Sequence, residues 1–323
     1  MAIRPIFIFS TVRTGSTLVQ RVIGAHRGVS TVGEPWLLLP QFYAFRERGI
    51  QAEYIHPVLT AALREFCDQL PGGREQYFTE LHNFVMRLYE ESAEPGATHF
   101  VDKSTGYDLI ADEVMNVFPE ARFVFLWRNP LASYASAVQT FGPWRPTMLR
   151  THFFIGLPRL VAAFSANRSR VHSAHFEQLT TGALDPWREL FDYLGVEFEP
   201  SSLERFPEVK PAGRMGDPTG VHEYSALSTE PSEKWKTVLA NPLRVAWARR
   251  YLAFLGDERL AVMGYDGKQL RAELDALPRD TASLGKDLVR TIGDFAREPV
   301  RVRTRRQGLG GPNVIRSLLA ARP

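Results

Sequence analysis

The stretch PIFIFSTVRTGSTLVQRVIG, residues 5–24, decides the fold. Its apolar run at residues 6–9 is short, which suits a strand buried on both faces of a parallel sheet. Small residues follow at positions 10–17, and apolar residues then recur at helical spacing from Leu18 onward. The pattern is strand, small-residue loop and helix. Because backbone N–H groups and the positive end of the helix dipole meet in such a loop, it predicts an anion-binding site.

A second unit of the same kind begins near residue 122. Residues 123–127 form an apolar run that ends at Arg128, and the helical pattern that follows contains Ser136, eight residues further on. An arginine at the carboxyl end of a strand and a hydroxyl group in the next helix can bind one phosphate together. Open α/β sheets bind ligands at the carboxyl ends of their strands. The two sites therefore predict a ligand with phosphates at both ends.

Further apolar runs, at residues 99–102 and 171–176, alternate with helical patterns. Strands that alternate with helices are typical of an α/β fold, so we predict a central, mostly parallel sheet flanked by helices. This alternation of strand and helix patterns weakens from about Asp275 onward. We predict one domain over residues 1–270 and a helical and basic extension over residues 271–323.

The composition is that of a globular protein, because 44% of the 323 residues are hydrophobic and 23% are charged. The single cysteine, Cys67, cannot form an internal disulfide, which points to a reducing compartment and excludes a zinc site built on several thiolates. No apolar run approaches the roughly 20 residues that span a bilayer. We expect a cytoplasmic protein with no membrane span.

The net charge of +3 is unevenly distributed. Residues 297–323 contain seven arginines and one acid, which leaves 32 bases and 35 acids in the preceding residues. A basic tail suits nucleic acid, a membrane or an anionic ligand. We favour a solvated arm over a nucleic-acid partner, since no zinc finger or RNA-recognition motif accompanies the arginines. The sequence leaves a homo-oligomer open.

The first loop has the frame of a nucleotide-binding P-loop with two changes. Ser10 replaces its first glycine, and Ser16 stands where the P-loop has a lysine. Arg13 is a different cation inside the loop. Without the lysine, chemistry at the γ-phosphate of a nucleotide loses its main cation, so a P-loop-like nucleotide kinase is the alternative rather than the main prediction.

In combination, these segments resemble sulfotransferases that use 3′-phosphoadenosine 5′-phosphosulfate (PAPS), bacterial members included. The first loop looks like the family's 5′-phosphosulfate loop, and the second unit looks like its 3′-phosphate motif. The matching segments are residues 10–17, 101–104, 123–136, 176–186 and 234–239. The resemblance covers roughly residues 5–266 and implies a P-loop-like three-layer α/β fold.

The resemblance also implies roles for individual residues. Arg13 should touch the bridging oxygen or the sulfonate of PAPS, and Lys103 should stabilise the sulfonate during transfer. The residues expected to bind PAPS, or the product 3′,5′-adenosine bisphosphate, are Arg13, Thr14, Gly15, Ser16, Thr17, Arg128 and Ser136. Arg128 and Ser136 should hold the 3′-phosphate, and no metal ion is expected.

The general base is expected to be a glutamate. Many cytosolic members of the family carry a histidine two residues after a lysine like Lys103, where this chain has Thr105. Other branches use a glutamate shortly after the first helix, and Glu34 matches that arrangement. Apolar neighbours such as Trp36 would raise the pKa of the Glu34 carboxyl, which would suit base catalysis.

Four histidines are relevant to the choice of base or to metal binding. His26 and His99 are the fallback candidates for the base. His172 and His175 are three residues apart on a predicted strand and would face opposite sides, so they do not predict a metal site.

Three apolar and aromatic stretches, residues 36–45, 142–144 and 153–155, follow the two motifs. Such residues beside a polar centre are usual in small-molecule pockets, although they are more often core. They favour a small apolar or aromatic hydroxyl acceptor. A carbohydrate or lipid acceptor, a binding protein without activity and a nucleic-acid binder are the remaining alternatives.

Overall fold

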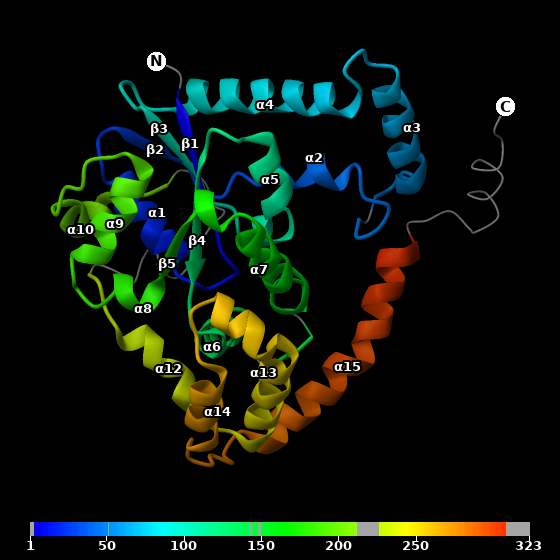
Figure 1. The fold of residues 1–323 in the computed structure, drawn as a ribbon. Helices are drawn as coiled ribbons and strands as arrows, with labels where there is room; N and C mark the ends of the chain where they lie inside the picture. The colour runs from blue at the N-terminus through cyan, green and yellow to red at the C-terminus, as the bar shows by residue number, and fades with distance from the viewer. Residues whose placement is uncertain (1–2, 51, 143, 148–149, 212–225, 308–323) are drawn as a thin grey trace.

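The computed structural model describes residues 3–50, 52–142, 144–147, 150–211 and 226–307, the last of these with side chains up to residue 296. Five strands form one sheet in the order β2-β3-β1-β4-β5, and every neighbouring pair is parallel (Figure 1). The strands are β1 (Arg4–Phe9), β2 (Val29–Thr31), β3 (His99–Asp102), β4 (Arg122–Trp127) and β5 (His172–His175). The predicted parallel sheet is confirmed.

Helices connect the strands and extend the chain beyond them. The helices up to β4 are α1 (Ser16–Gly24), α2 (Leu39–Tyr43), α3 (His56–Asp68), α4 (Gly73–Ser92), the 3₁₀ turn η1 (Thr105–Leu109) and α5 (Ala111–Val117). Between β4 and β5 lie α6 (Pro130–Thr140), the π-helical turn η2 (Thr151–Gly156), α7 (Leu157–Ala166) and η3 (Arg168–Arg170). After β5 come α8 (Phe176–Leu179), α9 (Asp185–Leu194), α10 (Ser202–Arg205), η4 (Phe206–Glu208), α12 (Glu230–Val238), α13 (Pro242–Val262), α14 (Gly267–Asp275) and α15 (Leu284–Gln307).

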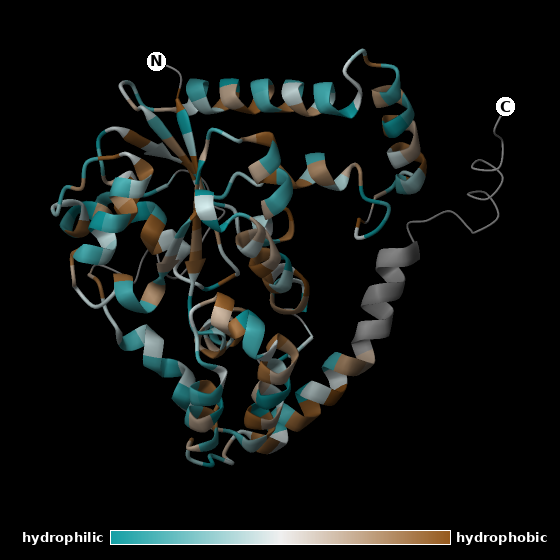
Figure 2. Ribbon diagram, in the orientation of Figure 1, coloured by the Kyte–Doolittle hydropathy of each residue, from teal (hydrophilic) through white to brown (hydrophobic). Residues whose placement is uncertain are grey.

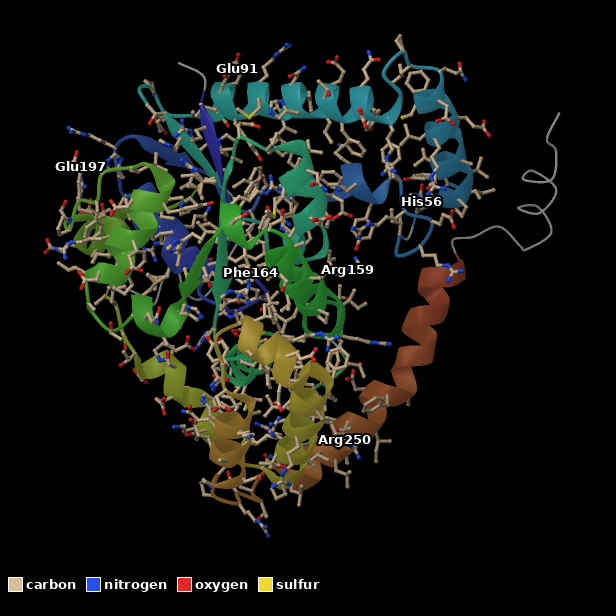
Figure 3. All side chains as sticks on the ribbon, in the orientation of Figure 1. His56, Glu91, Arg159, Phe164, Glu197 and Arg250 are labelled. Carbon is tan, nitrogen blue, oxygen red and sulfur yellow. The ribbon has the colours of Figure 1, made fainter. Side chains whose placement is uncertain are left out.

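Alternate residues of the buried strands supply two separate cores, because successive side chains of a strand point to opposite faces. Ile6 and Ile8 of β1 belong to a cluster with residues of α1 and α9. Phe7 and Phe9 belong to the other cluster, which includes residues of α4, α5 and α7. There Phe164 of α7, which is labelled in Figure 3, packs against the rings of Phe125 and Trp127. The fold therefore has three layers, as predicted.

Helices α6, α12, α13 and α14 gather beyond the carboxyl ends of the strands (Figure 1). Helix α14 packs on α13, and Leu270 and Leu274 of α14 are buried in the main core. The expected domain limit, between residues 270 and 271, falls inside this helix. Within the described residues, no helix is long and apolar enough to cross a bilayer.

Candidate active site

The loop between β1 and α1 has two residues in the left-handed region of backbone conformation. They are Arg13, with φ 62°, and Gly15, with φ 92°. A residue with a Cβ is uncommon there, and such strain is often found at functional sites. An added Cβ at Gly15 would lie 2.3 Å from the ring of Phe176, so this close approach requires glycine. Ser16 and Thr17 begin α1, whose first N–H groups have no partner within the helix.

Side chains of the two sequence motifs meet at the carboxyl ends of β1 and β4. The Arg13 Nε donates a hydrogen bond to the Ser136 Oγ at 3.3 Å. The Arg128 guanidinium donates to the backbone oxygen of Arg13 at 2.8 Å and to that of Pro231, and it lies over the Phe176 ring. Two arginines and a hydroxyl group that are distant in the sequence thus form one cationic cluster.

Two hollows open beside this cluster, and Arg13, Arg128 and Ser136 line both of them. The first also borders Gly15 and Phe176. The second also borders Lys234. Cationic side chains and hydroxyl groups around a concave site suit a ligand that carries phosphate groups.

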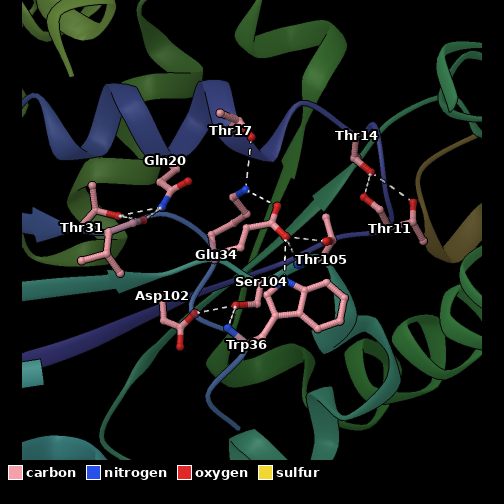
Figure 4. A network of polar contacts seen from close by, with 12 residues as sticks. Thr11, Thr14, Thr17, Gln20, Thr31, Glu34, Trp36, Asp102, Ser104 and Thr105 are labelled. Atoms are coloured by element: carbon pink, nitrogen blue, oxygen red, sulfur yellow. Dashed lines mark hydrogen bonds and ion pairs between the residues drawn. The ribbon is translucent and has the colours of Figure 1, made fainter. Parts of the chain in front are cut away.

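Lys103 and Glu34 form a buried ion pair at the carboxyl end of β3 (Figure 4). The Lys103 Nζ donates to the Glu34 Oε1 at 2.6 Å and to the Thr17 Oγ1 at 3.2 Å. The other carboxylate oxygen of Glu34 accepts from the Thr105 Oγ1 at 2.6 Å and from the Trp36 Nε1 at 3.1 Å. The predicted lysine and glutamate therefore lie together, beside the first turn of α1.

The pKa of Glu34 is lowered, contrary to the expectation that Trp36 would raise it. Burial alone raises the pKa of this carboxyl, but the charge and hydrogen bond of Lys103 and the hydrogen bonds of Thr105 outweigh it. The Trp36 indole also donates its N–H to the carboxylate, so it is a polar neighbour rather than an apolar wall. Glu34 is thus ionised at neutral pH.

Beneath this pair, a buried carboxyl group supports the end of β3. Asp102 accepts hydrogen bonds from Tyr89 at 2.6 Å, Tyr107 at 3.0 Å and Ser104 at 3.2 Å. Burial raises the pKa of Asp102 to about 6, although the three hydrogen bonds oppose the shift. The Ser104 hydroxyl also accepts from the Trp36 backbone N–H at 3.1 Å. This network connects β3 to the segment that carries Glu34.

A histidine outside every sequence motif pairs with a buried carboxylate on the turn that carries Thr105. The His152 Nδ1 hydrogen-bonds to the Asp108 carboxylate at 2.9 Å, and Asp108 is fully buried. Burial lowers the pKa of His152, but Asp108 and then Glu34 outweigh this, so the pKa is raised. Asp108 shares the turn η1 with Thr105, the hydroxyl donor to Glu34.

Sequence reasoning missed this pair because 44 residues separate its members. His152 is on the π-helical turn η2, a rare conformation that often marks functional sites. Gly156 ends that turn, and a Cβ there would lie 2.2 Å from the Asp108 carboxylate. A glycine four residues after a histidine is a weak signal without the tertiary structure.

The two fallback histidines lie elsewhere. His99 is the first residue of β3, so it lies at the amino end of the strand whose carboxyl end precedes Lys103. His26 follows the C-terminus of α1, and its Nδ1 accepts from the Gly28 N–H, just before β2. Neither side chain is near the carboxyl ends of the strands.

Most of the aromatic residues considered for an acceptor pocket are core residues. Phe42, Trp144 and Phe153 are buried in the main hydrophobic cluster. The half-buried Trp36 differs, because it directly contacts the Glu34 carboxylate.

The fold and this site define a class: an α/β protein with a site lined by cationic side chains and hydroxyl groups at the carboxyl ends of parallel strands. Residues 5–200, about 60% of the chain, match the model of a family described as the sulfotransferase family. The chain belongs to the sulfotransferase family.

Solved structures of sulfotransferase domains share the fold. The sulfotransferase domain from the curacin biosynthetic pathway is 20% identical, with a TM-score of 0.54 over 82% of this chain and 98% of that one. The sulfotransferase domain of the olefin synthase of Synechococcus PCC 7002 is 18% identical, with a TM-score of 0.53 over 79% of this chain and 96% of that one. At these identities the likeness establishes the fold alone.

Curated relatives match over part of their length. Nodulation protein NoeE of Sinorhizobium fredii is 28% identical over 138 residues, which are 42% of this chain and 31% of that protein. An uncharacterised protein of Aquifex aeolicus is 25% identical over 253 residues, which are 72% of this chain and 31% of that protein. The chain spans about a third of the length of the curated relatives that it matches.

Proposed function

We propose that this chain transfers a sulfuryl group from PAPS to a hydroxyl group of a small, apolar or aromatic acceptor. The observation that carries the proposal is the cationic cluster of Arg13, Arg128 and Ser136 beside a buried pair of Lys103 and Glu34. A donor with phosphates at both ends and a sulfonate suits such a row of cations.

The donor would lie across the carboxyl ends of β1 and β4. In this proposal Arg128 and Ser136 bind the 3′-phosphate, at the hollows that they line. The loop residues from Thr14 to Thr17 bind the 5′-phosphate through backbone N–H and hydroxyl groups, and Arg13 touches the bridging oxygen or the sulfonate. A nucleotide kinase fits less well, since Ser16 replaces the lysine of a P-loop.

The proposed transfer is a single in-line step. The acceptor oxygen bonds to sulfur while the bond from sulfur to the bridging oxygen breaks, and that electron pair remains on the 5′-phosphate. Glu34 accepts the hydroxyl proton, and Lys103 turns from Glu34 toward the sulfonate oxygens. A sulfuryl group carries less charge than a terminal phosphoryl group, so the cationic side chains suffice and the proposal includes no metal ion.

The acceptor class rests on Trp36. Its indole ring contacts the carboxylate that would remove the acceptor proton, so an aromatic or apolar alcohol could pack on the ring while its hydroxyl group meets Glu34. Carbohydrate and lipid acceptors are the alternatives that an acceptor panel separates.

The test is transfer of labelled sulfate from PAPS to a panel of phenols, aliphatic alcohols, sugars and lipids. Calorimetry with 3′,5′-adenosine bisphosphate, in chelator and in Mg²⁺, measures donor-site binding independently of the acceptor. We expect equal binding in both buffers and label on phenols or alcohols.

Two results would overturn the proposal. The first is absence of bisphosphate binding, or binding that requires Mg²⁺. The second is phosphoryl transfer from Mg·ATP in place of sulfuryl transfer. Bisphosphate binding with no transfer to any acceptor in the panel would instead indicate a binding protein without activity.

A further inference from the structure

The face that α15 turns toward the body is polar. Asp287 is fully buried and accepts hydrogen bonds from the Arg244 Nε at 2.8 Å and the Asn241 Nδ2 at 3.3 Å. Asp294 accepts from the Thr147 backbone N–H at 2.8 Å. Charged and polar contacts therefore hold this helix to α13 and to the segment after α6.

The opposite face of α15 is apolar and exposed. Leu288, Val289, Ile292 and Phe295 are 49%, 71%, 62% and 52% exposed. Their spacing places them on one stripe of the helix. The apolar stripe of a surface helix usually faces the core, whereas this stripe faces solvent. Figure 2 shows hydrophobic residues on this part of α15, which runs outward past α13. A contiguous exposed apolar stripe is typical of an interaction surface.

Positive charge accompanies the stripe. Lys286 and Arg290 lie on the same helix, and both are exposed. The chain from residue 297 onward adds seven arginines and one acid, whereas the preceding residues carry 32 bases and 35 acids. The apolar stripe and the net positive charge of the chain thus belong to one terminal segment.

We propose that α15 binds the surface of an anionic lipid bilayer, with the helix lying in the interface and its apolar stripe in the acyl boundary. A helix with an apolar stripe, flanking Lys and Arg residues and low mean hydropathy is typical of interfacial helices. Basic residues beside it add attraction to anionic headgroups.

The charge and the apolar surface of α15 argue against two other binding partners, a second copy of this chain and nucleic acid. Pairing of this face with that of a second copy would bring two arginine-rich segments together, which like charges oppose. Nucleic acid would attract the arginines but offers no apolar surface to the four exposed side chains. None of these residues belongs to the proposed donor site, so the inference is independent of the proposed function.

The experiment is flotation of the full chain with vesicles of phosphatidylcholine, with or without phosphatidylglycerol. We expect flotation with the anionic vesicles only, and less at high salt. The double variant Val289→Ser, Ile292→Ser should lose on the order of tenfold or more in partitioning, since each side chain contributes buried apolar surface. Lys286→Gln with Arg290→Gln should weaken binding at low salt.

The matched control is Phe66→Ser with Phe84→Ser, which removes two side chains of similar exposure, 55% and 52%, from α3 and α4. It should float like the unmodified chain. The unfolding midpoint of each variant, compared with that of the unmodified chain, shows whether the variant still folds. If the double variant does not fold, Val289→Ser alone is the milder substitute. Unchanged flotation of the α15 variants overturns the proposal. So does a vesicle-free dimer that Val289→Ser dissociates, or retention by RNA that outcompetes vesicles.

Discussion

The ammonium nitrogen of Lys103 lies 2.6 Å from a carboxylate oxygen of Glu34, and only 1% and 6% of the two side chains are exposed. Removal of one member of such a pair leaves an uncompensated buried charge. A ligand that attracts Lys103 therefore also changes the environment of Glu34. The two residues are best tested together.

Glu34→Gln keeps the shape of the side chain and removes the proton acceptor. If Glu34 is the base, turnover should fall by roughly 10²–10⁴. The affinity for 3′,5′-adenosine bisphosphate should change far less than turnover, because the described hydrogen bonds of Glu34 go to Lys103, Thr105 and Trp36 and none of them goes to the donor loop. Calorimetry and initial rates with an aliphatic alcohol measure the two effects, and near-normal turnover would contradict the assignment.

Lys103→Gln is the companion variant. Without the ammonium group, burial should raise the pKa of Glu34, so the acidic limb of the kcat/KM profile should move to higher pH. An acidic limb at the same pH in both proteins would show that another group sets it.

Arg128→Ala tests the proposed 3′-phosphate site. A lost charge-assisted hydrogen bond costs on the order of 1.5–3 kcal/mol, so the variant should bind the bisphosphate much more weakly while 5′-AMP, which lacks that phosphate, changes less. The matched control is Arg122→Ala, at the other end of β4, where the guanidinium lies over the Tyr193 ring. Equal losses for both nucleotides would place the 3′-phosphate elsewhere.

Asp108→Asn should lower the pKa of His152, because it removes the charge that outweighs burial. The folded pKa of His152 exceeds its ordinary value of 6.5, so its contribution to stability is complete below pH 6.5 and lost as the pH rises through the folded pKa. Ring NMR titrations and unfolding curves above pH 6 measure both effects. Gly156→Ala should act similarly, since its Cβ would displace Asp108. Identical His152 titrations in all three proteins would refute this account.

Asp102→Asn should flatten the pH dependence of stability on the acidic side of neutrality. Its folded pKa of about 6 lies above the ordinary 3.8, so the folded state binds this proton more tightly and loses stability as the pH rises from about 4 to 6. The loss is on the order of 3 kcal/mol. Denaturant unfolding at a series of pH values checks this, and parallel curves for both proteins would contradict it.

The sequence by itself determined the two strand-loop-helix units and the parallel sheet. Apolar periodicity and loop composition are local properties, and parallel strands place their carboxyl ends at one edge whatever the side chains do. That constraint alone predicted that the loop of Arg13 and the arginine after β4 would lie at the same edge of the sheet, whereas the place of Lys103 in the site was implied by the family resemblance.

Only the tertiary structure decided the charges and partners of the site. The sequence predicted an apolar setting and a raised pKa for Glu34, but packing places Lys103 against it and the pKa is lowered. The pairing of His152 with Asp108 depends on how η2 packs on η1, and no local pattern encodes it. The reason is physical: electrostatic interactions depend on distance and burial, which residues far apart in the sequence acquire only when the helices pack around the sheet.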